Sequence, residues 1–388
     1  MSAKGGWAVS VRVPVKPELI RWALDQAQTT TAQLKNGSQV ESWLDGEKQP
    51  TLKQLQGFAA HLHVPFGYLM MSAPPVLEKP LPDFRRRGTA TTRYSQELTD
   101  EIYIQQRRQD WFRDYALEQG LDAVSWVASA SMSDNPSAVA GHLREQWGFS
   151  TVQGSQDYSE SRREVFAFLE SIGVLVSVAG YVGSTQRAFD TSEFSGFSLF
   201  DEYAPLIFVN GKEAHSAQVF TMLHEVGHLV LGESGVSDDA HDSEQSSGSE
   251  RWCDEFAAAF LMPADEVQLL QPRNLSEEAV MPVAKRFRVS ALALLNRLRD
   301  LELISFEQWR AVYPEFEARA AEVLQRNASR KSSGGDFYRT QAFVVGRRFA
   351  QAVYREARSG RTPYADAHKL LGIRQRDAFE KFAGKVGA

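Results

Sequence analysis

The segment His-Glu-Val-Gly-His at residues 224–228 constrains the fold of this chain more than any other feature. Histidines four residues apart lie on one face of an α-helix, so His224 and His228 can bind one divalent metal ion from the same side. Glu225 is then placed to deprotonate a water molecule on that ion. The alternative is two ordinary histidines on an amphipathic helix. The flanking residues are apolar and predict a helix in a dry core: Met222, Leu223, Val226, Leu229, Val230 and Leu231.

A second run, residues 250–263, is apolar at helical spacing and stops at Pro263, which predicts a second helix. Glu250 and Asp254 share one face, which suits a third metal ligand and a carboxylate that orients one of the histidines. Two histidines and one glutamate leave a fourth coordination position open, as hydrolytic zinc sites require. Glu255 competes with Glu250 for the ligand role. Glu250 and Asp254 are also the acidic residues that any helix N-terminus favours.

These motifs resemble the ImmA/IrrE family of zinc metallo-endopeptidases. The resemblance rests on the HEVGH helix, on the run ERWCDEFAAAFLMP that starts at Glu250, and on LPDFR at residues 81–85, and it covers about residues 15–310. It implies a gluzincin-like fold, with one zinc ion per chain on His224, His228 and Glu250 and with Glu225 as general base. It also implies a protein substrate: a helix-turn-helix transcriptional repressor, cut once to release a regulon.

Composition is that of an ordinary globular protein: of 388 residues, 43% are hydrophobic and 24% are charged, enough chain for two or three domains. No apolar run approaches a membrane span and the N-terminus lacks a signal-peptide core, so we expect a cytoplasmic protein without a membrane partner. The single cysteine, Cys253, cannot form an internal disulfide, and its place beside Trp252 indicates a small buried residue. The net charge of −6 argues against a general nucleic-acid coat.

Residues 1–75 are predicted to form a helical domain. The run W-x-x-G-x-x-x-P-T-x-x-Q-L from Trp43 to Leu55 resembles the second half of an Xre/Cro-type helix-turn-helix. Between Leu34 and Val40, however, too few residues are available for a full helix, a turn and a recognition helix. Seven Lys/Arg against five Asp/Glu leave this region a net charge of only +2, below what a DNA-binding face usually carries. DNA stays a possible partner, but a packing or protein-docking role is favoured.

A linker at residues 76–95, with arginines at 85–87 that could touch phosphate or brace acidic neighbours, precedes the predicted metallopeptidase domain at residues 96–325. From about 95 to 170 the pattern is helical. Residues 174–178, 196–200 and 205–210 predict strands of a small mixed sheet just before the metal helix. An edge strand of that sheet could hold an extended peptide by main-chain pairing.

The stretch 233–249 is acidic and rich in serine and glycine, which predicts a mobile loop at the rim of the site. It contains His241. Peptide hydrolysis needs a group that stabilises the oxyanion, and both His241 and His215 are candidates that the sequence leaves unassigned.

Toward the C-terminus, residues 283–295 predict a helix, a turn and a second helix that close the hydrolase core. Residues 326–335 are rich in serine and glycine and predict a flexible linker. Apolar positions at helical spacing in residues 336–388 predict a small helical module without chemistry of its own.

The sequence thus predicts a mostly helical α+β fold with a gluzincin-like metallopeptidase core, and a zinc-dependent endopeptidase. In this hypothesis zinc activates water and polarises the scissile carbonyl, while Glu225 takes the water proton and delivers it to the leaving amine. The rival hypothesis is a DNA-binding regulator or antitoxin-like adaptor with a structural or inactive metal site. The presence of Glu225 argues against that rival, because a purely structural site has no use for this carboxylate.

Overall fold

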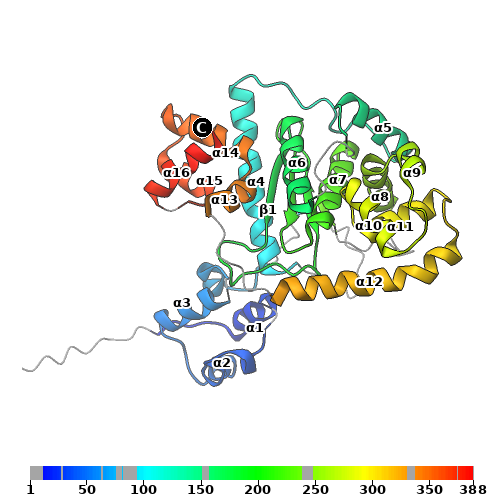
Figure 1. Ribbon diagram of the computed structural model, residues 1–388. Helices are drawn as coiled ribbons and strands as arrows, with labels where there is room; N and C mark the ends of the chain where they lie inside the picture. The colour runs from blue at the N-terminus through cyan, green and yellow to red at the C-terminus, as the bar shows by residue number, and fades with distance from the viewer. Residues whose placement is uncertain are drawn as a thin grey trace, which may run out of the picture. The chain divides into compact units, whose positions relative to one another are not determined.

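The structure, a computed structural model, describes residues 12–27, 29–62, 64–75, 81, 94–150, 157–237, 248–329, 337–373 and 375–387. The chain divides into two compact units, one of residues 1–80 and 90–101, the other of residues 81–89 and 102–388. Helices surround a small mixed sheet, which confirms the predicted α+β class (Figure 1). Within the described residues no helix has the length and apolarity to cross a bilayer.

The first unit is helical, as predicted. Its core is formed by apolar residues of α1 and α3, with Val40 and Trp43 of α2 packed against them. The shortened segment before Val40 that the sequence indicated is a single 3-10 turn, η1 (Thr31–Gln33), followed by α2. Gly37 is required there, because a Cβ atom on it would lie 2.1 Å from the Thr31 carbonyl oxygen. The elements are α1 (Pro17–Gln26), η1 (Thr31–Gln33), α2 (Gly37–Leu44), α3 (Leu52–His61) and η2 (Phe66–Met70).

The sheet of the second unit has the strand order β1-β3-β2-β4. Strands β1 and β3 are parallel, and β2 is antiparallel to both β3 and β4. Three strands were predicted, but the assignment of residues 235–237 to a loop was wrong. A three-residue strand is too short to show periodicity, and only its pairing with β2 creates it. The strands are β1 (Leu175–Ala179), β2 (Gly196–Leu199), β3 (Leu206–Asn210) and β4 (Gly235–Ser237).

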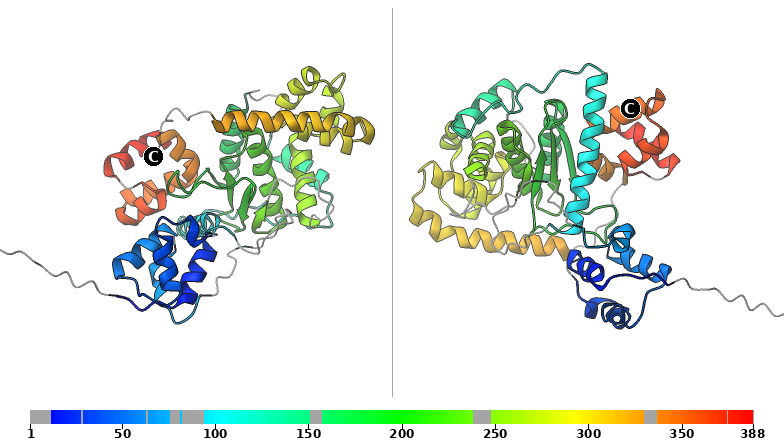
Figure 2. Two further views of the ribbon diagram at one scale, coloured as in Figure 1. Left: turned by 90° about the horizontal axis from the view of Figure 1, so that it is seen from below. Right: turned by 180° about the vertical axis from the view of Figure 1, so that it is seen from behind.

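Helices cover both faces of this sheet. Helices α6 (Tyr158–Ser171) and α7 (His215–Leu231) lie on one face, and α4 (Gln96–Glu118) runs along the other (Figures 1 and 2). The predicted helical region at 95–170 is therefore three helices, since α5 (Pro136–Gln146) and two loops separate α4 from α6. The core between the sheet and α7 is built from alternate strand residues: Val176, Val178, Ile207 and Val209.

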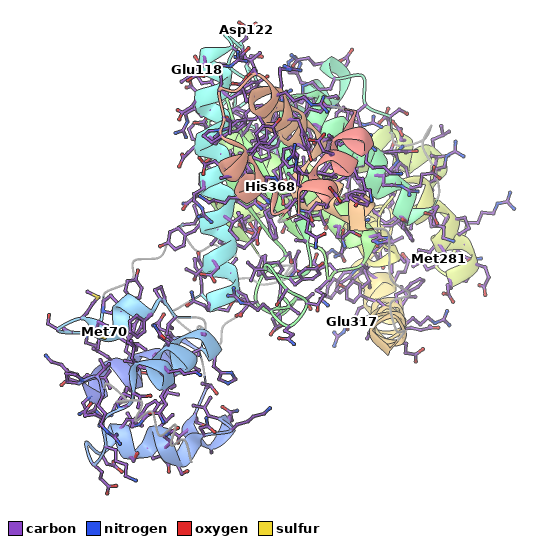
Figure 3. The ribbon with its side chains drawn as sticks, turned by 90° about the vertical axis from the view of Figure 1, so that its left-hand side faces the viewer. Met70, Glu118, Asp122, Met281, Glu317 and His368 are labelled. Atoms are coloured by element: carbon purple, nitrogen blue, oxygen red, sulfur yellow. The ribbon has the colours of Figure 1, made fainter. Side chains whose placement is uncertain are left out.

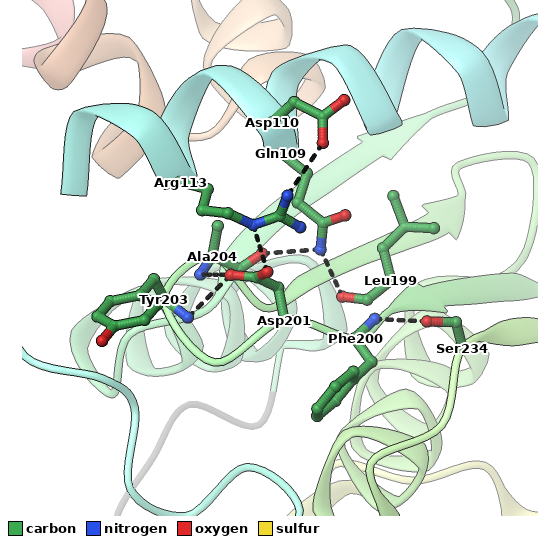
Figure 4. A network of polar contacts seen from close by, with 9 residues as sticks. All are labelled: Gln109, Asp110, Arg113, Leu199, Phe200, Asp201, Tyr203, Ala204 and Ser234. Atoms are coloured by element: carbon green, nitrogen blue, oxygen red, sulfur yellow. Dashed lines mark hydrogen bonds and ion pairs between the residues drawn. The ribbon is translucent and has the colours of Figure 1, made fainter. Parts of the chain in front are cut away.

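Polar side chains of α4 fix the turn between β2 and β3 (Figure 4). Gln109 Nε2 donates to the carbonyl oxygens of Leu199 at 2.8 Å and Ala204 at 3.0 Å. Asp201 accepts from Arg113 Nε at 2.5 Å, and its other oxygen accepts from the backbone N–H of Ala204 at 2.7 Å. Because each of these polar groups has a hydrogen-bond partner, the turn has one fixed conformation. This conformation sets the position of β2 beside α7.

The remaining helices follow the metal motif. The predicted helix, turn and helix at 283–295 are confirmed. The first residues of the predicted linker, 326–329, belong to α12, so the linker was predicted to start too early. The rest of that linker, like residues 82–93, lies outside the described residues. The helices are α8 (Gly248–Leu261), α9 (Ala264–Leu270), α10 (Glu277–Arg286), α11 (Ala291–Asp300), α12 (Phe306–Ser329), α13 (Phe337–Val345), α14 (Arg347–Arg358), α15 (Tyr364–Leu371) and α16 (Arg376–Val386).

The C-terminal helices belong to the same compact unit as the sheet. Ser177 Oγ, on β1, donates to the carbonyl oxygen of Val344 at 2.7 Å. Arg108 of α4 donates to the same carbonyl at 3.0 Å and to that of Leu370 at 3.1 Å. One guanidinium thereby links α4 to the C-terminal ends of two later helices.

Glu170 of α6 is a carboxylate buried against the N-terminus of α14, with 9% of its surface exposed. Its Oε1 accepts from the backbone N–H of Arg348 at 2.9 Å. Burial raises the pKa of Glu170 to about 7, while the N–H groups and charges of Arg347 and Arg348 work in the opposite direction. In the folded protein the protonated form is therefore favoured below about pH 7.

A pH-dependent stability follows for Glu170. Because its pKa is about 7 in the fold and ordinarily 4.5, its stabilising effect is complete below pH 4.5 and is lost as the pH rises through 7. Through this group the free energy of unfolding should fall by about 3 kcal/mol from pH 4.5 to pH 8. Glu170→Gln, a neutral acceptor, should lack that fall in urea titrations, whereas Glu317→Gln on the exposed face of α12 (Figure 3) should follow the wild type. Identical pH dependence of Glu170→Gln and wild type would contradict the assignment.

Candidate metal centre

Helix α7 carries three functional side chains into the core. His224 is 4% exposed, and Glu225 and His228 are fully buried. The helix ends at Gly232, whose φ of 75° is the left-handed conformation that glycine adopts without strain. After this reversal the backbone N–H of Glu233 donates to the carbonyl oxygen of His228 at 2.8 Å. The chain therefore turns back over the last turn of the metal helix.

Helix α8 crosses α7 at Gly227, the fourth residue of the HEVGH motif. A Cβ atom on Gly227 would lie 3.0 Å from Cys253 Sγ and 3.1 Å from Cys253 Cα. Cys253 is fully buried, as predicted, and fills the space that the glycine leaves. The close approach of the two helices brings Glu250, one turn earlier on α8, to the two histidines.

Three donor groups converge on one point. His224 Nε2 lies 3.2 Å from His228 Nε2, Glu250 Oε1 lies 3.0 Å from His228 Nε2, and Glu250 Oε2 lies 3.4 Å from His224 Nε2. Donor atoms from all three residues lie within 4.8 Å of one another, and all three side chains are buried. Ligands about 2.0–2.1 Å from a tetrahedral zinc ion are about 3.4 Å apart, so this spacing fits one ion.

Each histidine has a carboxylate on its outer ring nitrogen. Asp254 Oδ1 lies 2.8 Å from His224 Nδ1, and Glu233 Oε2 lies 3.4 Å from His228 Nδ1. In the neutral ring, a carboxylate on Nδ1 keeps the proton on that nitrogen and leaves the lone pair of Nε2 free. Both Nε2 atoms are thus prepared to bind a metal, and both face Glu250.

The charges of the cluster compensate one another. Burial opposes a charge on His224, but Glu250 and Asp254 outweigh it and hold the pKa of His224 well above its usual range. Burial likewise works against an ionised Glu250, but the two histidines reverse the effect and lower the pKa of Glu250 to about 2. Glu250 is therefore an anionic donor, as a metal ligand must be.

Glu225 is the exception in this balanced group. Neither of its carboxylate oxygens has a hydrogen-bond partner of good geometry, although the Ser237 hydroxyl lies close enough to act on it. Burial raises the pKa of Glu225, with the histidines acting in the opposite direction. Two orphaned oxygens beside a His-His-Glu donor set fit a zinc site with an open fourth position, whose incoming groups would supply the missing partners.

The structure brings together His224, His228, Glu250, Asp254 and Glu225, the residues that the sequence singled out. Glu255 points elsewhere: it is exposed and accepts from Ser137 Oγ at 3.0 Å. His215 is the first residue of α7, about 13 Å from His224 along the helix axis. His241 lies outside the described residues.

Sequence reasoning missed Glu233 and Ser237, since both were assigned to a loop. Ser237 ends β4 with Oγ 3.4 Å from His228 Nε2. A signal for Glu233 was available: it follows Gly232, a glycine at the predicted end of the metal helix, and such helix ends return the chain toward the last turn. No pattern of the sequence indicates Ser237.

The three candidate ligands lie inside a segment that matches a known protein family. Residues 185–299 match the family of IrrE N-terminal-like domains, and residues 345–385 match a domain family of unknown function. Two proteins named radiation response metalloprotease IrrE, from Deinococcus radiodurans and Deinococcus deserti, are each 32% identical over 107 residues. That match spans 26% of this chain and only 33% and 38% of the two relatives. The predicted resemblance to the ImmA/IrrE family is confirmed, for a match that covers about a third of those proteins.

The crossing of α7 and α8 makes a prediction for Gly227. Gly227→Ala should lower the free energy of unfolding by about 1–3 kcal/mol, because the added methyl group comes too close to Cα and Sγ of Cys253 and the two helices must shift apart. This loss should appear although alanine is the better helix former by about 0.5–1 kcal/mol. Urea denaturation measures it. Gly141→Ala is the matched control on α5, where a Cβ atom has nothing within 4 Å, and it should be neutral or stabilising. Equal stability of the two variants would contradict the tight crossing.

Proposed function

We propose that this chain is a zinc-dependent endopeptidase. The observation that carries the proposal is the buried convergence of His224, His228 and Glu250 beside an unpaired Glu225. The donor set supports zinc, since two imidazoles and one carboxylate with an open position are typical of hydrolytic zinc sites. The name of the two Deinococcus relatives, metalloprotease, supports the same class of activity.

In the proposed reaction His224, His228 and Glu250 hold the ion, and Asp254 and Glu233 keep the two imidazole rings in their binding orientation. When bound, zinc supplies Lewis acidity, which lowers the pKa of water to about 7 and polarises a carbonyl group. Glu225 accepts the proton of the attacking water and delivers it to the leaving amine. Its lack of a fixed hydrogen-bond partner supports this role, because a base that is already paired would have to break that contact first.

The proposed substrate is a protein, and specifically a helix-turn-helix transcriptional repressor. Support for the repressor comes from the family resemblance of the motifs, and the abbreviated helical unit at the N-terminus is a candidate for docking it. The sheet next to the site supports an extended peptide as the bound form, because strands present main-chain groups at the spacing that such a peptide needs.

The rival function, a regulator or adaptor with a structural or inactive metal site, predicts a different donor set. A structural zinc site is closed by a fourth protein ligand. Among the described residues, the His, Cys, Asp and Glu side chains whose ligand atoms all lie within 4.8 Å of one another are His224, His228 and Glu250 alone. In such a site the two buried Glu225 oxygens, which have no partner of good geometry, would destabilise the fold by about 1–3 kcal/mol each.

Metal content tests the ligand set. The purified protein should hold about one zinc ion per chain, and His224→Ala, His228→Ala and Glu250→Ala should each lose most of it. Glu255→Ala is the matched control, since it removes an exposed glutamate from the same helix as Glu250. Elemental analysis after dialysis gives the stoichiometry. Full zinc occupancy in Glu250→Ala would exclude Glu250 as the third ligand.

Glu225→Gln tests the proposed reaction. The variant should keep zinc and fold yet lose cleavage by about a thousandfold, because the amide cannot accept a proton from water. Enrichment of new protein N-termini from cells that produce the wild type or the variant, followed by mass spectrometry, identifies the cleaved protein. Its cut product should appear only with the wild type and with the control Glu255→Gln. A product formed equally by Glu225→Gln would rule out Glu225 as the base and favour the rival function.

A further inference from the structure

Peptide hydrolysis places negative charge on the carbonyl oxygen, and a hydrogen-bond donor aimed at that oxygen usually contributes much of the rate. Neither histidine that the sequence offered for this role is near the described centre: His215 begins α7, and His241 lies outside the described residues. The centre contains a different hydroxyl donor. We propose that Ser237 is a further catalytic residue, which donates a hydrogen bond to the carbonyl oxygen of the scissile peptide bond. This inference rests on the proposed peptidase function.

The position of the hydroxyl is the first argument. Ser237 is 2% exposed, and its Oγ lies 3.4 Å from His228 Nε2. That separation falls in the range of 3.0–3.4 Å that joins the donor atoms of the three candidate ligands to one another. The Ser237 hydroxyl therefore borders the same small space as His224, His228 and Glu250, where the reacting groups must meet.

The second argument concerns its proton. Once a metal is bound, His228 Nε2 has neither a proton nor a free lone pair, so it can no longer share a hydrogen bond with the Ser237 hydroxyl. Two groups can then receive the Ser237 proton: Glu225, whose oxygens have no hydrogen-bond partner of good geometry in the structure, and the incoming carbonyl oxygen. Glu225 is engaged with the attacking water during the reaction. The carbonyl oxygen is left as the acceptor.

The third argument is rigidity. Ser237 pairs with Gly196 across β2 and β4, and its carbonyl oxygen accepts from the backbone N–H of Ser195 at 3.0 Å. The other end of β4 is fixed by Ser234 Oγ, which accepts from the backbone N–H of Phe200 at 2.7 Å (Figure 4). A donor held by a strand needs no reorganisation during the reaction, which is the condition for effective electrostatic stabilisation.

Gly196 explains how the strand comes so close to the base. A Cβ atom at this position would lie 3.0 Å from Glu225 Oε1, 2.8 Å from Thr221 Cγ2 and 2.9 Å from the carbonyl oxygen of Phe208. Only glycine lets β2 lie directly against this part of α7. In this pair, Gly196 has no side chain and so leaves room for Glu225, and Ser237 places its hydroxyl next to the candidate metal ligands.

Neighbouring strand β2 offers a matched control. Ser198 is fully buried, its hydroxyl has no partner within the described residues, and it pairs with Gly235, two residues before Ser237. Ser198→Ala and Ser237→Ala therefore make the same chemical change in the same sheet, but only Ser237 contacts the metal cluster.

Binding of acetohydroxamic acid, a small zinc-binding carbonyl compound, tests the role without a known substrate. Isothermal titration of zinc-loaded protein should give about tenfold weaker binding for Ser237→Ala than for wild type, the worth of one hydrogen bond, and unchanged binding for Ser198→Ala. Zinc content should stay equal in all three proteins. With the cleaved protein in hand, Ser237→Ala should also lower kcat by about 100-fold or more at unchanged zinc content.

The outcomes separate the two proposals. Wild-type affinity for acetohydroxamic acid in Ser237→Ala would overturn the role of Ser237 and leave the peptidase function standing. Loss of zinc from folded Ser237→Ala would make Ser237 a metal ligand and would also overturn it. Should Ser237→Ala not fold, Ser237→Gly removes the same hydroxyl and gives the same reading. A wild-type zinc protein that binds no acetohydroxamic acid would contradict the open position, and with it the proposed function.

Discussion

The close crossing of α7 and α8 at Gly227 is the contact on which the whole centre depends. Two of the converging donors are on α7 and the third is on α8, so their separation is set by how near the two helix axes come. With Gly227 facing Cys253, the backbones approach until a Cβ atom would be only 3.1 Å from Cys253 Cα. A larger residue at either position would move Glu250 outward, and a metal tolerates donor shifts of only a few tenths of an ångström.

That crossing also concentrates charge in the core. His224, His228, Glu250 and Glu225 are all buried, and the first three pair with one another while Glu225 has no good partner. Burying such a group without compensation is unfavourable. The sheet leaves room for this cluster, because Gly196 of β2 has no side chain where it faces Glu225. Strand β4 adds a polar group there, the Ser237 hydroxyl. A buried cluster of this kind couples metal binding to stability, since the ion interacts with the folded site and not with the unfolded chain.

The local patterns predicted most of the elements. The apolar spacing around His224 and the apolar run ending at Pro263 predicted both helices that carry the candidate ligands. Each helix is long enough for its sequence to show the 3.6-residue period. Three short, mainly apolar runs predicted β1, β2 and β3 within one residue at each end. Strand β4 was missed, and the region from 95 to 170 was not resolved into separate helices. Short strands and loops between helices depend on partners distant in sequence, which no local pattern contains.

By itself the sequence determined the chemical identity of the centre: two histidines at helical spacing, a glutamate between them, and a carboxylate pair on a second helix. It also left Glu250 and Glu255 in competition. The tertiary structure separates the two residues. Where α8 crosses α7, Glu250 faces the two histidines, whereas Glu255 faces Ser137. Glu233 and Ser237 likewise entered the centre through a chain reversal and a strand pairing. Ligand spacing within one helix is a local property of the backbone, whereas the approach of a second element is fixed by packing across the whole core.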